Sequence, residues 1–178
     1  MSEDRAPHLE HRRLGPSQLR FALFTVSSSR YEAKLRGEEF GDDSMEEAVK
    51  AIGKGGHKVV QREVINDDIV MIRGKLAEAL QREDVDVIVF MGGTGLTRRD
   101  VTIEAVRPML EKEAEGFGDI FRYLSYREIG AAAALTRATA GVAKGKAVLC
   151  LPGSPKAVRL AFKEFLGELP HMLYLARR

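Results

Sequence analysis

The 178-residue chain has 28 basic and 26 acidic residues, a net charge of +2 and 44% apolar residues. These proportions are typical of one globular domain, and the balanced charge argues against nucleic acid or a membrane surface as a partner. The chain has a single cysteine, Cys150, which excludes a disulfide within it. No segment reaches the roughly 18 apolar residues of a membrane span, and the start has no signal-peptide apolar core, so we expect a cytoplasmic location.

The N-terminal segment is polar and ends near Gly15 and Pro16. We therefore predict a mobile arm over residues 1–18, followed by one domain over residues 19–178. The first core strand is predicted over residues 19–26, and a long polar connection over 31–44 follows it. Asp42, Asp43 or Ser44 is expected to cap a helix over 45–54 that ends at glycine.

Strands and helices then alternate along the chain. Residues 57–65 read as a charged strand near a sheet edge, 69–82 as an amphipathic helix, and 85–91 as a buried strand. A helix is predicted over 101–110, a glycine break at 116–118, and helical segments over 118–123 and 127–134. Strands over 136–142 and 146–151 precede a last helix over 156–175, which Pro170 is expected to kink. This alternation predicts a three-layer α/β/α sandwich with a mainly parallel sheet.

The most distinctive stretch follows the buried strand over 85–91. It contains Gly92, Gly93, Thr94 and Gly95, so main-chain N–H groups can approach a ligand without obstruction by Cβ atoms. Two arginines and a carboxylate come next, in the order Arg98, Arg99 and Asp100. A phosphate, a metal ion and the start of a helix are expected to share this place.

Three other strand ends carry polar or rigid residues. Ser27 and Ser28 follow the first strand, Asp67 follows the second, and Pro152, Gly153, Ser154 and Pro155 follow the last. Parallel strands bring their carboxyl ends to one rim, where ligands bind in open α/β sheets. A helix cap is the simpler role for one of the adjacent carboxylates after the second strand.

The expected rim offers main-chain amides, hydroxyls, arginines and carboxylates, without a His or Cys suited to nucleophilic attack. This set suits phosphoryl or nucleotidyl transfer between substrates that bring their own nucleophile, with Mg²⁺ held by two carboxylates. Strict nucleotide motifs are absent. A P-loop ending at Gly145-Lys146 would need glycine where Ala140 stands, and a dinucleotide fingerprint would need glycine where Arg98 stands.

Several ordered blocks together resemble the signatures of the MoaB/MogA family of molybdenum cofactor biosynthesis. The blocks are Gly92-Gly93-Thr94-Gly95, Arg99-Asp100-Val101-Thr102, Glu115-Gly116-Phe117-Gly118 with Phe121-Arg122, and Leu151-Pro152-Gly153-Ser154-Pro155. The likeness covers residues 21–175. It implies a molybdopterin-binding α/β fold assembled as a homotrimer or homohexamer, and a molybdopterin adenylyltransferase that uses Mg-ATP and releases pyrophosphate.

The resemblance also assigns roles to single residues. It makes Asp67 and Asp100 the two essential acids, with Asp100 serving the Mg-nucleotide. It places the nucleotide against Ser27, Ser28, the Gly92–Gly95 loop and Arg99, and it places molybdopterin against Pro152, Gly153 and Ser154. One position departs from many active relatives, because Asn66 stands where they carry proline before the first acid.

Two rival functions stay open at this point. A protein of the same fold that only binds or carries molybdopterin would take up the pterin without releasing pyrophosphate from Mg-ATP. A nucleotide pyrophosphatase would hydrolyse nucleotide without any pterin. The sequence also leaves open which of the adjacent Arg98 and Arg99 faces the phosphates, since neighbouring side chains on an extended loop point apart.

Overall fold

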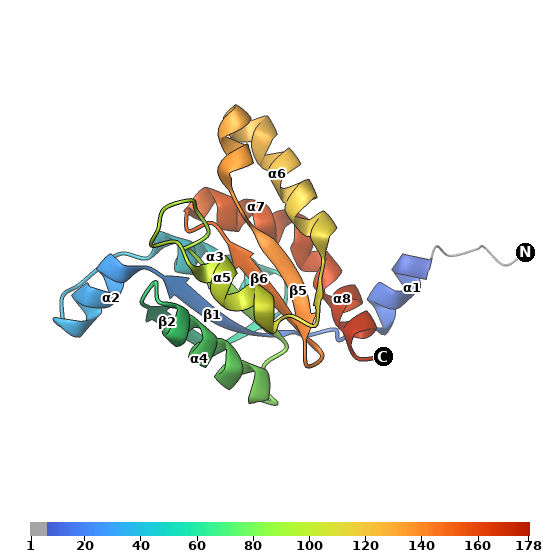
Figure 1. Ribbon diagram of the computed structural model, residues 1–178. Coiled ribbons are helices and arrows are strands. Elements are labelled where there is room, and N and C mark those ends of the chain that lie inside the picture. Colours follow the sequence, from blue (N-terminus) through green and yellow to red (C-terminus); the bar gives the residue numbers. More distant parts are fainter. Residues whose placement is uncertain (1–6) are drawn as a thin grey trace, which may run out of the picture.

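The computed structural model describes residues 7–178 and consists of a six-stranded sheet with helices on both faces (Figure 1). The strands are β1 (Arg20–Val26), β2 (Lys58–Ile65), β3 (Val87–Met91), β4 (Lys112–Glu113), β5 (Thr139–Ala143) and β6 (Lys146–Leu151). The helices are α1 (Pro7–Leu14), α2 (Ser28–Leu35), α3 (Asp43–Lys54), α4 (Ile69–Gln81), α5 (Thr102–Val106), α6 (Glu115–Ile129), α7 (Pro155–Phe165) and α8 (Leu169–Ala176). Short 3₁₀ turns are η1 (Arg107–Met109), η2 (Gly130–Leu135) and η3 (Leu166–Glu168).

The strand order is β2-β1-β3-β6-β5-β4. The first four strands in this order run parallel, β5 is antiparallel to β6, and β4 is antiparallel to β5. The predicted mainly parallel sheet is therefore confirmed, as is the place of the charged strand β2 at an edge. Because β1, β2, β3 and β6 are parallel, the segments that follow them leave the sheet at the same rim.

Alternation along the central strands divides the core into two layers. In β1, Phe21 and Leu23 face one core cluster, which is completed by α3, α6, α7 and α8. Ala22 and Phe24 face the other cluster, which is completed by α4 and α5. Figure 1 shows α4 and α5 on the near side of the sheet, with α3 and α7 behind it. The predicted three-layer sandwich follows from this burial of both sheet faces.

Two predicted connections are helical instead. Within the predicted mobile arm, residues 7–14 form α1, and residues 1–6 lie outside the described part. The ring of His11 in α1 packs 5.0 Å from Tyr174 of α8, and a Cβ on Gly15 would collide with the carbonyl of Pro170. The polar stretch after β1 begins with α2, which the side chain of Ser27 caps. Helix α2 buries none of its residues and contributes no residue to either core cluster.

The predicted break at residues 116–118 is wrong, because α6 runs without interruption from Glu115 to Ile129. Gly118 is needed for close packing rather than for a turn. A Cβ there would lie 2.9 Å from the carbonyl oxygen of Ala138 and 2.9 Å from the guanidinium of Arg122. The predicted single helix over 156–175 is interrupted before Pro170 and is not kinked at it: α7 ends at Phe165, the 3₁₀ turn η3 follows, and Pro170 lies in the first turn of α8, where its missing N–H costs nothing.

A buried carboxylate fixes the amino end of the sheet. Asp86, whose side chain is 5% exposed, accepts from the main-chain N–H of Arg20 at 3.0 Å and from that residue's guanidinium at 2.9 Å. The guanidinium of Arg177, at the end of the chain, binds the same carboxylate at 2.8 Å. Asp86 therefore joins the first strand, the central strand and the C-terminal segment at the rim opposite to the polar loops.

Over the described residues, no helix has the length and apolar character needed to cross a bilayer.

Candidate functional site

Hydrogen bonds between neighbouring strands bring four polar segments together at one rim. The N–H of Ser27 donates to the carbonyl of Ile65 at 3.0 Å, which joins the ends of β1 and β2. The N–H of Gly92 donates to the carbonyl of Leu151 at 2.9 Å, which joins the ends of β3 and β6. The strand ends predicted to meet, which carry Ser27, Asp67, Gly92 and Pro152, therefore do meet.

The first two glycines of the loop allow backbone contacts that no side chain would permit. Gly92 and Gly93 have positive φ angles of 114° and 62°. A Cβ on Gly92 would lie 2.2 Å from the carbonyl oxygen of Val26, and one on Gly93 would lie 2.3 Å from the hydroxyl oxygen of Thr102. That hydroxyl donates to the carbonyl of Gly92 at 2.8 Å, so the first residue of α5 closes the loop from below.

Asp100 folds back into the loop that precedes it. Its Oδ2 accepts from the N–H of Thr97 at 2.8 Å, and a Cβ on Gly95 would lie 2.8 Å from the same oxygen. The carboxylate thus lies against the glycine backbone. Helix α5 begins after Val101 without any side-chain cap, so Asp100 does not serve as a helix cap.

Asp67 reaches the same loop from the end of β2. Its Oδ1 accepts from the N–H of Val101 at 3.3 Å, and a Cβ on Gly93 would lie 2.7 Å from that oxygen. The helix cap after β2 is the neighbouring Asp68, which accepts from the N–H of Met71 at 2.8 Å. The helix-capping role expected for one of these two adjacent acids therefore belongs to Asp68, and Asp67 does not cap α4.

The electrostatic environment of Asp67 disfavours its charge. Burial raises its pKa, the hydrogen bond from Val101 opposes that rise, and the negative charges of Asp100 and Glu104 raise the pKa further. Within residues 7–178, neither Asp67 nor Asp100 forms an ion pair with an arginine, lysine or histidine. A pair of neighbouring carboxylates without a cationic partner is an arrangement that a bound cation would stabilise.

The donor set fits Mg²⁺ bound together with phosphates. Asp67 and Asp100 offer hard oxygen ligands at one loop, and the described residues contain no group of three or more acidic, histidine or cysteine side chains arranged to enclose a metal ion. Mg²⁺ commonly takes one or two protein carboxylates and completes its shell with water and phosphate oxygens. Two carboxylates beside a glycine loop match that pattern.

The turn after β6 lies directly against the glycine loop. A Cβ on Gly153 would come within 3.1 Å of the Cα of Gly92. The buried hydroxyl of Ser44, at the start of α3, donates to the carbonyl of Gly153 at 2.7 Å and holds the turn in place. The cap of α3 is Asp42, so among the three candidates Ser44 has this other role. Ser154 caps α7.

The remaining predicted nucleotide contacts lie around this centre. Ser27 and Ser28 stand at the start of α2, and the Ser27 hydroxyl accepts from the N–H of Arg30 at 3.4 Å. Thr94 is buried, while Arg98 and Arg99 are both exposed on the outer part of the loop. The main-chain N–H of Arg99 donates to the Thr97 hydroxyl at 3.3 Å, and the Arg99 guanidinium takes no part in this bond.

No motif in the sequence pointed to Arg137, which reaches the loop from just before β5. Its guanidinium donates to the carbonyl of Thr94 at 3.2 Å and to that of Asp100 at 3.1 Å, and it pairs with Glu104 of α5. Arg137 stands in an alanine- and threonine-rich stretch, within the strand predicted over 136–142, and its partners are 33 to 43 residues away in the chain. Only the folded chain reveals this contact.

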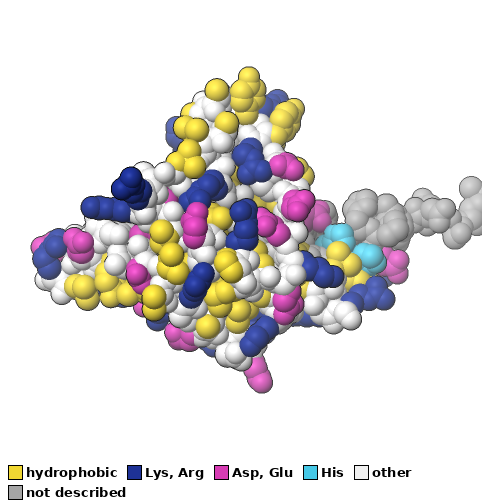
Figure 2. Space-filling view, in the orientation of Figure 1, with side chains coloured by type: hydrophobic (Ala, Val, Ile, Leu, Met, Phe, Trp, Pro, Cys, Tyr) yellow, Lys and Arg dark blue, Asp and Glu magenta, His cyan; other side chains and the backbone are white. Residues whose placement is uncertain are grey.

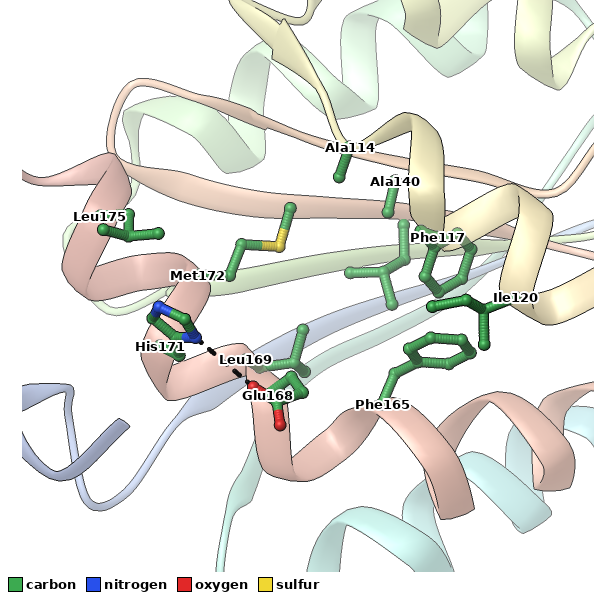
Figure 3. A pocket seen from close by; sticks show the side chains of 11 residues that line it. Ala114, Phe117, Ile120, Ala140, Phe165, Glu168, Leu169, His171, Met172 and Leu175 are labelled. Carbon is green, nitrogen blue, oxygen red and sulfur yellow. Dashed lines mark ion pairs between the residues drawn. The ribbon is translucent and has the colours of Figure 1, made fainter. Parts of the chain in front are cut away.

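A second feature of the surface is an apolar hollow of about 320 Å³ between α6, α7 and α8. Figure 3 shows Phe117, Ile120 and Phe165 at one end and Met172 and Leu175 at the other. The ion pair between His171 and Glu168, 3.5 Å apart, lies at its edge. No residue of the glycine loop lines this hollow, so it is separate from the polar rim.

Comparison with protein families gives one match over most of the chain. Residues 22–171 match the family described as "Probable molybdopterin binding domain". The match includes the carboxyl end of β1, the glycine loop and the turn after β6, and so covers every element of the rim.

Known relatives agree with this match. The "Molybdenum cofactor biosynthesis protein B" of Bacillus cereus is 41% identical over 171 residues, covering 95% of this chain and 97% of the relative. The "Probable molybdopterin adenylyltransferase" of Methanocaldococcus jannaschii is 40% identical, covering 92% and 96%. The crystal structure of the tungsten cofactor synthesizing protein MoaB from Pyrococcus furiosus superposes with a TM-score of 0.80 at 37% identity, covering 92% of this chain and 99% of that one.

Proposed function

This chain belongs to the MoaB/MogA family, and we propose that it is a molybdopterin adenylyltransferase of molybdenum cofactor biosynthesis. In the proposed reaction the terminal phosphate of molybdopterin attacks the α-phosphorus of Mg-ATP, AMP is transferred to that phosphate, and pyrophosphate leaves. The observation that supports this proposal best is the juxtaposition of Asp67 and Asp100 at a glycine loop that also touches the turn at Gly153.

The residues of the rim supply positioning and charge stabilisation in this reaction. The open backbone of Gly92, Gly93 and Gly95 lets main-chain N–H groups approach phosphate oxygens. Arg99, exposed on the loop, adds positive charge beside the nucleotide, and Ser27 and Ser28 border the nucleotide from the end of β1. No general base is required, because the attacking phosphate is already anionic at neutral pH.

Asp67 and Asp100 are the residues that would hold Mg²⁺ in this proposal, with Asp100 as the direct ligand. When bound, the ion would neutralise charge on the phosphate oxygens. The turn of Pro152, Gly153 and Ser154 would meet the pterin. Its contact with the glycine loop at Gly92 would bring the two substrates next to each other, which is the main requirement for transfer between them.

One assay separates the proposed function from its rivals. Purified protein is incubated with Mg-ATP, with and without molybdopterin, and both pyrophosphate and adenylylated pterin are measured. The transferase produces both in equal amounts, and only when molybdopterin is present. A carrier protein binds the pterin and produces neither, and a nucleotide pyrophosphatase cleaves nucleotide with no pterin present. Either of these last results would contradict the proposal.

We also propose that the chain forms a homotrimer or a homohexamer through its apolar surfaces. Helix α6 and η2 project from the sheet as an arm, here called the α6 arm (residues 115–135), and Figure 2 shows hydrophobic side chains gathered at its tip. Tyr126, Ile129 and Leu135 on this arm are 59%, 56% and 61% exposed. Such a patch on a single chain is a candidate for contact with a second copy.

The apolar hollow of Figure 3 supplies a complementary surface where Phe117 and Ile120, near the start of α6, meet α7 and α8. A projecting apolar tip and an apolar hollow on one chain favour a head-to-tail contact, in which the tip of one copy enters the hollow of the next. Contacts of this kind generate closed rings when the rotation between copies closes. A three-membered ring, or two such rings stacked, agrees with this geometry.

A further inference from the structure

Arg137 makes contacts that span the whole functional part of the glycine loop. Its guanidinium donates to the carbonyl of Thr94, which lies before the loop turns outward, and to the carbonyl of Asp100, where the loop returns. The exposed residues 96–99 lie between these two points. One side chain therefore holds both ends of the segment that bears the Asp100 carboxylate.

The geometry of these contacts suits arginine and no other side chain. Separate nitrogens of the planar guanidinium, Nε and Nη2, serve the two carbonyls at 3.2 and 3.1 Å, and Nη1 is paired with the Glu104 carboxylate. A lysine offers a single ammonium and cannot reach three acceptors in this fixed fork. Glu104 belongs to α5, whose first residue Thr102 binds the carbonyl of Gly92, so the pairing also ties Arg137 to the helix beneath the loop.

The chemistry at the two carbonyls explains why this arrangement matters for the site. When the carbonyls of Thr94 and Asp100 accept from Arg137, they are turned toward that guanidinium. This contact fixes the two peptide units adjoining Asp100 and Thr94, and hence the direction in which the Asp100 side chain leaves the loop. Arg137 is 28% exposed at its side chain, so these bonds are partly shielded from water.

We propose that Arg137 is a positioning residue, which acts through the main chain of the glycine loop to hold Asp100 in the orientation that binds the metal-nucleotide. This inference rests on the proposed adenylylation. It assigns to Arg137 no contact with either substrate. Glu104 assists by keeping the guanidinium in place.

The chain offers a matched control in Arg107. Both arginines line the same polar hollow of about 500 Å³, which is separate from the apolar hollow of Figure 3. The guanidinium of Arg107 donates to the carboxylate of Glu113 at 2.9 Å, away from the glycine loop. Arg107→Met removes an arginine from the same surroundings without touching the loop.

The test compares Arg137→Met, Arg137→Lys and Arg107→Met with the wild-type chain in two measurements. The first is steady-state adenylylation at varied Mg²⁺ and ATP. We expect kcat/KM to fall about 100-fold in Arg137→Met, the loss that a misplacement of about 1 Å can produce, with a higher Mg²⁺ requirement. Arg137→Lys should recover only part of this loss, and Arg107→Met should stay within about twofold of wild type.

The second measurement is hydrogen exchange of the main-chain amides over residues 94–101, which does not depend on turnover. Exchange there should accelerate in Arg137→Met, with little change over β1 and α7. Unchanged loop exchange, or kcat/KM within about twofold of wild type in Arg137→Met, would overturn the positioning role. If the wild-type chain itself makes no adenylylated pterin, the proposed function fails, and the exchange comparison alone then decides whether Arg137 orders the loop.

Discussion

Asp67 combines two features that a purely structural side chain has no reason to combine. It is partly buried, and it lies near a second carboxylate without a cationic partner among the described residues, so its pKa is raised. A raised carboxyl pKa means that the folded protein holds its proton more tightly than the unfolded chain does. The ionised group therefore destabilises the folded state at neutral pH. Functional sites commonly carry such a cost.

Asp67→Asn should accordingly abolish adenylylation yet raise thermal stability. The amide oxygen can still accept from Val101, while the unfavourable charge is removed. The stability that Asp67 lends when protonated is present below its ordinary pKa of 3.8 and is lost as pH rises through the raised folded value. We expect Tm at pH 7 to rise by about 1–2 °C. This gain should shrink toward zero near pH 3.

Differential scanning calorimetry of wild type and Asp67→Asn across this pH range checks the prediction. Asp84→Asn, which changes an exposed carboxylate paired with Arg82, serves as the control. A lower Tm for Asp67→Asn at neutral pH would show that Asp67 contributes to stability through a partner, and it would remove the electrostatic argument for a cation site.

Residues of the site could be predicted from the sequence where they directly follow a predicted strand. Asp67, Gly92 and Gly153 follow strands whose apolar runs are plain in the sequence, and parallel strands bring such residues to one rim. The sequence could not decide which of Asp67 and Asp68 caps α4, because the choice depends on backbone angles at the turn. It could not reveal Arg137 or the bond from Ser44, since neither contact is local.

Among the elements, strand β3 has polar groups next to both of its ends. Its carboxyl end opens into the glycine loop, and the residue before its amino end is the buried Asp86. Burial acts to raise the pKa of Asp86, but the hydrogen bonds from Arg20 and Arg177 outweigh it, so the pKa is lowered. The ionised carboxylate is therefore a source of stability.

Asp86→Asn should lower the free energy of unfolding by about 2–3 kcal/mol at pH 7, because it weakens a buried, charge-assisted network. The contribution of Asp86 is present above the ordinary pKa of 3.8 and is lost as pH falls through the lowered folded value. Urea denaturation at pH 7 and at pH 3 measures both effects. Asp84→Asn should cost less than about 1 kcal/mol, since exposed pairs contribute little. An equal loss of unfolding free energy in the two variants would contradict the stabilising role of the Asp86 network.

Elements were predictable in proportion to how they bury apolar side chains. The four parallel strands, α3 and α4 have clear periodicity, and each was placed to within a few residues. Helix α2 buries no residue, and its sequence was read as part of a polar connection. The glycines at 116 and 118 imitate a break, but Gly118 is a contact point with the carbonyl of Ala138. Glycine in a sequence does not distinguish a turn from close packing.

At the scale of the whole molecule, the proposed assembly depends on the tip of the α6 arm. Ile129→Asp should place a charge where the proposed contact is apolar, and sedimentation should then show single chains in place of trimers or hexamers. Val70→Asp is the matched control, because Val70 is an apolar residue of α4 that is 78% exposed and lies away from the arm. A wild-type chain that sediments as a monomer, or an Ile129→Asp variant that keeps the wild-type mass, would contradict this contact.

In the proposed reaction, Asp100 binds the metal-nucleotide at the glycine loop. Asp100→Asn tests it most directly, because the amide oxygen can still accept from the N–H of Thr97 while the negative charge is lost. The measurement is the rate of Mg-ATP-dependent adenylylation of molybdopterin by wild type, Asp100→Asn and Asp84→Asn, with circular dichroism as the check on folding. We predict a loss of at least about 100-fold for Asp100→Asn alone, with an unchanged spectrum. Near-normal turnover by the folded Asp100→Asn variant would contradict the proposed role of Asp100.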